Sequence, residues 1–457
     1  MFEFIKYLKK GRHGHLIGIG GVSMSPLAEV LSGLGLVITG SDISESERTD
    51  RLRRLGMNIK IGHDASNIGP DTEFVVRTAA AHDDNPEIAK ARELGIPVFE
   101  RTQAWGAIMP GYKNALCISG THGKTTTTSM CTHILMAAEK DPTVMIGGTL
   151  PLLKASHRVG KGDTIVMESC EYYNSFWAFY PTVAVILNIE ADHLDFFSGI
   201  DDIKHSFRVF ASHVKKGGYI VANHDDKNAM EAVAGLGQKL VTFGLTSEAD
   251  VYAENIVSIG ANTKFDLMHN GKFVESIDLH VPGLHNVKNA LAAAAATLCI
   301  GVKPTAIKYG LAGFSGAGRR FEFKGKFNGA DVYDDYAHHP GEVKALIDTV
   351  EKLGYKRTIL VFQPHTYSRT KALFDDFVQQ LRRPDIVYLA EIFAAREKNT
   401  LGISSKDLAE KIEGARFFPS FEEIEESLRK EAQPGDLILT VGAGNVYKIG
   451  EDLLENK

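Results

Sequence analysis

A glycine-containing loop between an apolar run and a helical pattern holds the residues best suited to chemistry. Residues 115–118 are apolar, Gly120 follows, and Gly123, Lys124 and Thr125 stand where the helical pattern begins. Backbone N–H groups of such a loop, together with the positive end of a helix, bind phosphate oxygens. The lysine would contact the outer phosphates and the threonine hydroxyl would bind magnesium. The stretch predicts a phosphate-binding loop, although the first glycine stands two residues later than in the general pattern G-x-x-x-x-G-K-[ST].

Acidic and imidazole side chains follow two further predicted strands, residues 163–167 and 183–188. Glu168 and Glu171 follow the first strand, and His193 follows the second. The carboxyl ends of parallel strands meet at one edge of a sheet, where the phosphate loop also lies. Magnesium prefers oxygen ligands. Thr125 and one carboxylate could therefore hold one ion, and Glu168 or Glu171 with His193 could hold a second.

A second glycine-rich turn lies near the N-terminus, between a predicted strand at 15–19 and a predicted helix at 26–34. The run Gly18-x-Gly20-Gly21 lacks the third glycine of the dinucleotide fingerprint, whereas Asp42 lies near the offset of its acidic residue. One interpretation is a plain tight turn, and another is a diphosphate bound at the helix N-terminus. That diphosphate could belong to NAD or to a nucleotide sugar. A nicotinamide-dependent oxidoreductase is thus the competing class, but it leaves the phosphate loop unexplained.

Two dense polar clusters follow predicted strands in the last third of the chain, at residues 334–340 and 363–370. Because both occupy equivalent ends of one predicted sheet, they indicate a single binding face. Arg369 in the second cluster would suit a carboxylate, since the planar guanidinium binds carboxylates through two parallel hydrogen bonds.

The alternation of strand and helix patterns predicts the elements that position these groups. A chain of 457 residues is too long for one ordinary core. Alternation over 15–110 and again from 331 predicts parallel sheets with helices on their faces. Asn270-Gly271 between two alternating segments, 263–268 and 272–280, predicts an antiparallel hairpin. Linkers are expected at 105–113 and 316–322, which gives an α/β fold of three domains with limits 1–112, 113–317 and 318–457.

Composition excludes several classes of protein. A net charge of −6 with both signs dispersed argues against a nucleic-acid partner. The first residues carry an acid and lack an apolar core, so no secretory signal is expected. The longest apolar stretch, 290–302, is too short and too rich in alanine for membrane insertion. The four cysteines show no CxxC pairing and suit a reduced, cytoplasmic protein.

In this order along the chain, the motifs resemble those of the Mur ligases. The resemblance covers nearly the whole chain and includes the late glycine of the phosphate loop. It implies an N-terminal Rossmann-like UDP-binding domain, a central P-loop ATPase-like domain and a C-terminal Rossmann-like domain that binds the amino acid. The motifs that carry it are Gly120-Thr121-His122-Gly123-Lys124-Thr125-Thr126, Asn188-Ile189-Glu190-Ala191-Asp192-His193, Gly283-x-His285-Asn286-x-x-Asn289, Arg319-Arg320-Phe321-Glu322, Asp335-Tyr336-x-His338-His339-Pro340 and Gln363-Pro364-His365-x-x-Ser368-Arg369-Thr370.

Within the family, the last two motifs resemble those of the member that joins L-alanine to UDP-N-acetylmuramate. They leave open the related member that joins a whole tripeptide to the same acceptor. The resemblance implies ATP and Mg²⁺ as cofactors, an acyl-phosphate intermediate, and ADP and phosphate as products, in the synthesis of peptidoglycan precursors. It further implies a cytoplasmic protein that is a monomer or a weak homodimer.

The resemblance also implies roles for single residues. Thr125 and Glu171 would hold one magnesium ion and His193 the other. The residues expected to take part in catalysis are Lys124, His193, Arg319, His338 and Arg369. The residues expected to contact ATP are Gly120, Thr121, His122, Gly123, Lys124, Thr125, Thr126, His285, Asn289, Arg319 and Asp335. The residues expected to contact the UDP substrate or alanine are Gly18, Gly20, Gly21, Ser23, Met24, Ser25, Asp42, Tyr336, His338 and Arg369.

The chain departs from the family pattern at three places. Cys170-Glu171-Tyr172-Tyr173 replaces a frequent Asp-Glu-Ser-Asp, which leaves Glu168 and Glu171 as rival metal ligands. Thr366 stands where many relatives carry a second arginine, so recognition of the substrate carboxylate would depend on Arg369. The helix nearest the second metal offers Lys204 and Arg208, and the carbamylated lysine of some relatives is not expected here.

Overall fold

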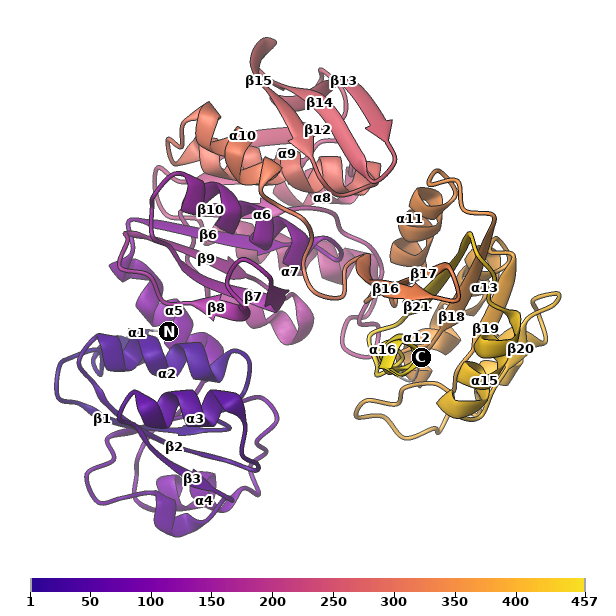
Figure 1. Ribbon diagram of the computed structural model, residues 1–457. Coiled ribbons are helices and arrows are strands. Elements are labelled where there is room, and N and C mark those ends of the chain that lie inside the picture. Colours follow the sequence, from indigo (N-terminus) through magenta and orange to yellow (C-terminus); the bar gives the residue numbers. More distant parts are fainter. Residues whose placement is uncertain (1, 456–457) are drawn as a thin grey trace.

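The first of three α/β units (Figure 1) contains a parallel sheet. This sheet has five strands in the order β3-β2-β1-β4-β5. The computed structural model describes residues 2–455. Strand order reverses between β1 and β4, and such a reversal opens a crevice for ligands at the carboxyl ends of the strands. The elements are α1 (Phe2–Ile5), β1 (His13–Ile17), α2 (Met24–Gly33), β2 (Val37–Asp42), α3 (Glu47–Arg54), β3 (Asn58–Ile61), η1 (Ala65–Asn67), β4 (Phe74–Arg77), α4 (Pro86–Glu93) and β5 (Val98–Glu100).

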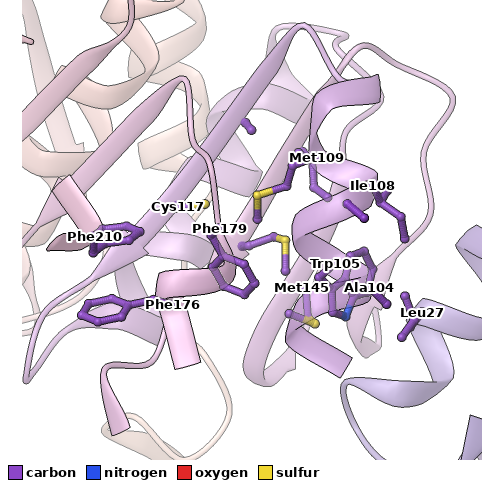
Figure 2. Close-up of a cluster of buried hydrophobic side chains, with 14 of the residues drawn as sticks. Leu27, Ala104, Trp105, Ile108, Met109, Cys117, Met145, Phe176, Phe179 and Phe210 are labelled. Carbon is purple, nitrogen blue, oxygen red and sulfur yellow. The ribbon is translucent and has the colours of Figure 1, made fainter. Parts of the chain in front are cut away.

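The linker predicted at 105–113 is wrong in its first half, where the chain is helical. Helix α5 (Arg101–Ile108) and the short 3₁₀ helix η2 (Met109–Gly111) occupy this segment. Trp105 and Met109 are buried in a cluster that includes Leu27 of the first unit and Phe179 of the second (Figure 2). The helix is therefore stabilised by its apolar side chains, which fill the junction between the two units.

The central unit contains a ten-stranded sheet of order β15-β14-β13-β12-β11-β10-β6-β9-β7-β8. Strand β6 is flanked by β9 and β10, both parallel to it, so the chain segments that follow these three strands meet at one edge. The predicted hairpin is confirmed as β14 and β15, with Asn270 and Gly271 both in the left-handed region.

The central unit combines helices with runs of consecutive strands. They are β6 (Asn114–Ser119), α6 (Lys124–Ala137), β7 (Thr143–Leu150), β8 (Ala155–Arg158), β9 (Thr164–Glu168), η3 (Tyr172–Ala178), β10 (Val183–Ile186), α7 (Ile200–Ser212), β11 (Tyr219–Asn223), α8 (Lys227–Val233), β12 (Lys239–Gly244), β13 (Val251–Ile259), β14 (Asn262–His269), β15 (Lys272–Leu279), α9 (Leu284–Cys299) and α10 (Pro304–Ala312).

The third unit is a six-stranded sheet of order β16-β17-β21-β18-β19-β20, parallel except for β16 against β17. Strands β17 and β18 both flank β21, so the polar clusters that follow them share one face, as predicted. The elements are β16 (Glu322–Phe327), β17 (Ala330–Asp335), α11 (Pro340–Val350), β18 (Arg357–Phe362), α12 (Tyr367–Ala372), α13 (Phe374–Leu381), β19 (Ile386–Leu389), α14 (Ser405–Ala409), β20 (Arg416–Phe417), α15 (Phe421–Glu431), β21 (Asp436–Val441) and α16 (Tyr447–Glu455).

The fold class is the predicted one, three α/β units with mainly parallel sheets. Each sheet lies within one of the three domain limits expected from the sequence, and we keep those limits as a proposal. Among residues 2–455, no helix has the length and apolar character needed to cross a bilayer.

Candidate active site

The phosphate loop connects β6 to α6 through two glycines that no other residue could replace without strain. Gly120 and Gly123 have φ angles of 144° and 82°. A Cβ atom on Gly120 would lie 2.8 Å from the Leu187 side chain, and one on Gly123 would lie 2.5 Å from Asn289 Oδ1. Both values are shorter than real Cβ contacts, so this backbone form requires glycine.

Lys124 begins helix α6, and its ammonium group lies inside the loop. Its Nζ donates to both carboxylate oxygens of Glu171, at 3.1 and 3.0 Å, and to the carbonyls of Gly120 and Thr121. Burial alone would lower the pKa of Lys124, but the Glu171 carboxylate outweighs it and raises that pKa. A fixed positive charge therefore stands where the loop predicts phosphate oxygens.

The two candidate glutamates have different partners. Thr125 Oγ1 donates to Glu168 Oε2 at 2.9 Å, and Glu168 Oε2 also accepts the Gly147 N–H at 2.7 Å. Glu171 instead lies against Lys124, with its Oε1 3.9 Å from His193 Nε2. Hydroxyl and carboxylate oxygens are donors that Mg²⁺ prefers, so these residues fit the expected ion. The expected pairing of Thr125 with Glu171 stays a prediction, since Glu168 is the carboxylate that touches Thr125.

His193 follows β10 in an uncommon backbone form for a residue with a side chain. Its φ is 53°, its ring stacks on Tyr172 at 4.2 Å, and its Nε2 lies 3.7 Å from Asp192 Oδ2. Burial lowers the pKa of His193, against the pull of Asp192 and Glu171. The neutral ring thus has a lone pair for a metal ion.

Arg369 on α12 reaches across to the central unit and pairs with Asp192. Its Nε and Nη2 donate to Asp192 Oδ1 and Oδ2 at 3.0 and 3.3 Å, and its Nη1 donates to the His365 carbonyl at 2.9 Å. The two side chains are 10% and 8% exposed. The guanidinium expected to bind a substrate carboxylate is therefore already engaged by a carboxylate of the protein. Its substrate role stays a prediction.

His338 lies beside Tyr336 on a cavity of about 600 Å³, which Lys124 and Thr125 also line. Its Nδ1 lies 2.9 Å from the Tyr336 carbonyl, which fixes the proton on Nδ1 and leaves the lone pair on Nε2. Burial lowers the pKa of His338 to about 4. The ring is thus a neutral base on the edge of the cavity.

The two neighbouring arginines of the Arg319-Arg320 motif have different surroundings. Arg319 has a φ of 58° and turns into the third unit, where it donates to Asp334 at 2.8 Å and to the carbonyls of Gly442 and Gly444. Arg319 and Arg320 both line the 600 Å³ cavity, and Arg320 also lines a neighbouring cavity of about 240 Å³. The role expected of Arg319 toward ATP phosphates stays a prediction, and Arg320 is a second candidate for it because it lines both cavities.

The 240 Å³ cavity adjoins the phosphate loop and brings together the other residues expected around the nucleotide. Gly123, Thr126, His285, Asn289 and Asp335 all line it. Burial lowers the pKa of His285 to about 4 and raises the pKa of Asp335 to about 6. A concave cavity beside the cationic loop suits a nucleoside with its phosphates toward Lys124.

Three consecutive stretches of the chain match domains of one protein family. Residues 13–113 match the Mur ligase family catalytic domain, 118–297 the Mur ligase middle domain, and 319–444 the Mur ligase glutamate ligase domain. The chain belongs to the Mur ligase family. The resemblance inferred from the motifs is thereby confirmed.

Relatives within the Mur ligase family match over nearly the whole chain. The chain is 49% identical over 448 residues to the UDP-N-acetylmuramate--L-alanine ligase of Agathobacter rectalis, covering 97% of this chain and 98% of that protein. It is 46% identical over 460 residues to the ligase of the same description from Clostridium novyi, covering 100% of both. The crystal structure of UDP-N-acetylmuramate-alanine ligase MurC from Thermotoga maritima matches with a TM-score of 0.79 and 29% identity, covering 97% of this chain and 98% of that one.

His122 of the Mur ligase loop joins the central and third domains. Its Nε2 lies 3.2 Å from Glu190 Oε2, and its Nδ1 lies 3.2 Å from Glu342 Oε1. Burial opposes a positive charge here, but the two carboxylates outweigh it and raise the pKa of His122 to about 9. Sequence reasoning missed Glu342, whose only signal is its place in the first turn of α11 after Pro340.

The N-terminal turn of this Mur ligase is fixed by its own side chains. Gly20 N–H donates to Asp42 Oδ2 at 2.8 Å, so Asp42 supports the turn. Arg101, which sequence reasoning missed, donates to Ser23 Oγ at 2.6 Å, and burial lowers its pKa. The contacts expected of Gly18, Gly20, Gly21, Ser23, Met24, Ser25 and Asp42 with the substrate stay predictions.

Proposed function

We propose that this chain is the ATP-dependent ligase that joins L-alanine to UDP-N-acetylmuramate in peptidoglycan precursor synthesis. The observation that carries this proposal is the 600 Å³ cavity, which brings the phosphate loop of one domain against His338 of another. Whole-length relatives at 46–49% identity described as this ligase support the choice of substrates.

The proposed chemistry begins with two anions that repel each other. The muramate carboxylate attacks the γ-phosphorus of ATP, and ADP leaves with the electron pair of the broken bond. Lys124, together with Arg319 or Arg320, offsets the repulsion and stabilises charge on the transferring oxygens. Thr125, Glu168, Glu171 and His193 would hold Mg²⁺, which supplies further neutralisation when bound.

The amine of L-alanine then attacks the acyl carbon, and phosphate leaves. Nε2 of His338 would take a proton from the amine, since its ring is neutral and its lone pair is on the outer nitrogen. Acyl phosphates hydrolyse in water. The cross-domain pair of Asp192 with Arg369 supports a closed arrangement that limits the access of water to the cavity.

Phosphate release tests this proposal directly. The enzyme receives ATP, Mg²⁺ and UDP-N-acetylmuramate with L-alanine, L-serine, glycine or the tripeptide of the related ligase. We expect rapid release with L-alanine and little release with the tripeptide. Preference for the tripeptide would assign the chain to the recycling reaction instead. The cytoplasmic location and the monomeric or weakly dimeric state inferred from the sequence stay predictions.

A further inference from the structure

A second cluster of potential metal ligands lies away from Thr125 and His193, at the junction of the central and third domains. It consists of His122, Glu190 and His339, whose ligand atoms all lie within 4.8 Å of one another. Glu190 Oε2 lies 3.2 Å from His122 Nε2 and 3.8 Å from His339 Nδ1. Two ligands on one tetrahedral zinc ion stand about 3.3 Å apart, given bond lengths of about 2.0–2.1 Å. Small movements of these side chains would therefore bring the three ligand atoms to coordination distance of one ion.

The outer nitrogens of both rings already face acceptors. His122 Nδ1 lies 3.2 Å from Glu342 Oε1, and His339 Nε2 lies 3.3 Å from the Ala191 carbonyl. Acceptors in these positions orient metal-bound histidines, because they favour the proton on the outer nitrogen while the inner nitrogen faces the ion. In the metal-free protein the two carboxylates favour a protonated His122 whose Nε2 lies against Glu190, so zinc would bind by displacing the Nε2 proton. In the present structure the His339 Nδ1 lone pair accepts the Gly341 N–H at 3.2 Å, and a metal ion would take that contact.

An ion could reach this cluster from solvent. The Glu190 side chain is 44% exposed, and both His122 and Glu190 line the 240 Å³ cavity. Water could therefore complete the coordination shell from the cavity side. Two imidazoles and one carboxylate favour zinc over magnesium, which prefers oxygen ligands.

We propose that His122, Glu190 and His339 form a zinc site that is separate from the magnesium ligands and bridges two domains. Two ligands come from the central domain and one from the third. Zinc bound here fixes the two domains against each other and slows any cycle that needs them to separate.

Zinc binding to the purified full-length chain tests the site. The protein is stripped with a chelator and kept in excess Mg²⁺, so that the oxygen-rich site is filled. Zinc is then titrated against a chromogenic chelator, and cobalt is added to separate samples for its visible absorption. We expect one tight equivalent of zinc and a cobalt spectrum typical of tetrahedral coordination.

Three variants locate the ligands. Glu190→Gln and His339→Gln should each weaken zinc binding at least tenfold, and both should lose the cobalt spectrum. His338→Gln is the matched control, since it removes the adjacent histidine and should leave zinc affinity unchanged. Circular dichroism verifies that each variant is folded. Wild-type protein without the tight equivalent, or equal losses in His338→Gln and His339→Gln, would overturn the proposal.

A thermal measurement tests the bridge between domains. Zinc should raise the melting midpoint of wild type and of His338→Gln, but not that of Glu190→Gln. An equal rise in all three proteins would place zinc elsewhere. Neither measurement uses L-alanine ligation, so failure of the zinc site and failure of the proposed function would be distinguished.

Discussion

Arg319 and Arg320 are neighbours in the chain, but their side chains serve different parts of the protein. Both line the 600 Å³ cavity, but Arg319 is bonded to Asp334 and to two carbonyls, whereas Arg320 also lines the 240 Å³ cavity. We predict that Arg320→Gln raises the KM for ATP about tenfold, because a hydrogen bond to a charged group contributes about 1.5–3 kcal/mol. Steady-state kinetics at saturating L-alanine measures this.

Arg319→Gln is the matched variant. It should destabilise the third domain by about 3 kcal/mol, because Asp334 would remain buried without its charged partner. Thermal melting separates the two effects. A normal melting midpoint for Arg319→Gln together with a raised KM for ATP would reverse our assignment.

A magnesium titration distinguishes the roles of the two glutamates near Thr125. Glu168→Gln and Glu171→Gln are each assayed for turnover across a range of Mg²⁺ concentrations. The family resemblance predicts that Glu171→Gln raises the magnesium requirement about tenfold or more and that Glu168→Gln has a smaller effect. A larger effect of Glu168→Gln than of Glu171→Gln would contradict this prediction and would agree with the contact between Glu168 and Thr125.

The raised pKa of His122 predicts a pH-dependent contribution to stability. Its folded pKa of about 9 exceeds the usual value of 6.5. The stabilisation by Glu190 and Glu342 is therefore complete below pH 6.5 and is lost as pH rises through 9. With chelator present, melting midpoints of wild type and His122→Gln should differ most near pH 6.5 and converge above pH 9. A gap that stays constant with pH would show that His122 is not charged in the folded protein.

At the scale of elements, helix α5 packs tightly on the 3₁₀ segment η3. A Cβ atom on Gly106 would lie 1.9 Å from the Ala178 carbonyl oxygen. We predict that Gly106→Ala destabilises the protein by about 3 kcal/mol, at the upper end for overpacking, because backbone must move. Gly111→Ala is the control, since its Cβ would meet nothing within 4 Å. Similar urea midpoints for both variants would show that the junction is looser than described.

The periodicity of apolar residues and the positions of turn residues predicted most elements well, because both depend on which nearby residues are buried. The strand predicted at 163–167 lies within one residue of β9 at each end, and Asn270-Gly271 specified its hairpin. Helix α5 was missed because Pro110-Gly111 indicates a linker, while the partner surface that buries Trp105 comes from other parts of the chain. The candidate site, too, was predictable only in part. Motifs predicted the residue types, but the pairing of Asp192 with Arg369 depends on how two domains meet.

At the scale of the whole molecule, the first two domains share one hydrophobic cluster, whereas the contacts of the third domain described above are polar. We predict that Arg369→Gln opens the third domain and raises the radius of gyration measured by X-ray scattering, because Asp192 loses its partner. Arg383→Gln is the matched control, since Arg383 pairs only with Asp348 and Glu351 of its own domain among the ion pairs described. Identical scattering from both variants would show that other contacts hold the domain.

The strand order of the third sheet also bears on how the protein is made. Strand β21 lies between β17 and β18, yet it is the last strand in the chain. A ribosome releases domains from the N-terminus onward. The first two domains could therefore fold during translation, but the third sheet lacks its central strand until residues 436–441 have left the exit tunnel. The 600 Å³ cavity, whose lining residues come from the central and third domains, is thus completed only after nearly the entire chain has been synthesised. A truncated product would carry a phosphate loop without the groups that complete the site.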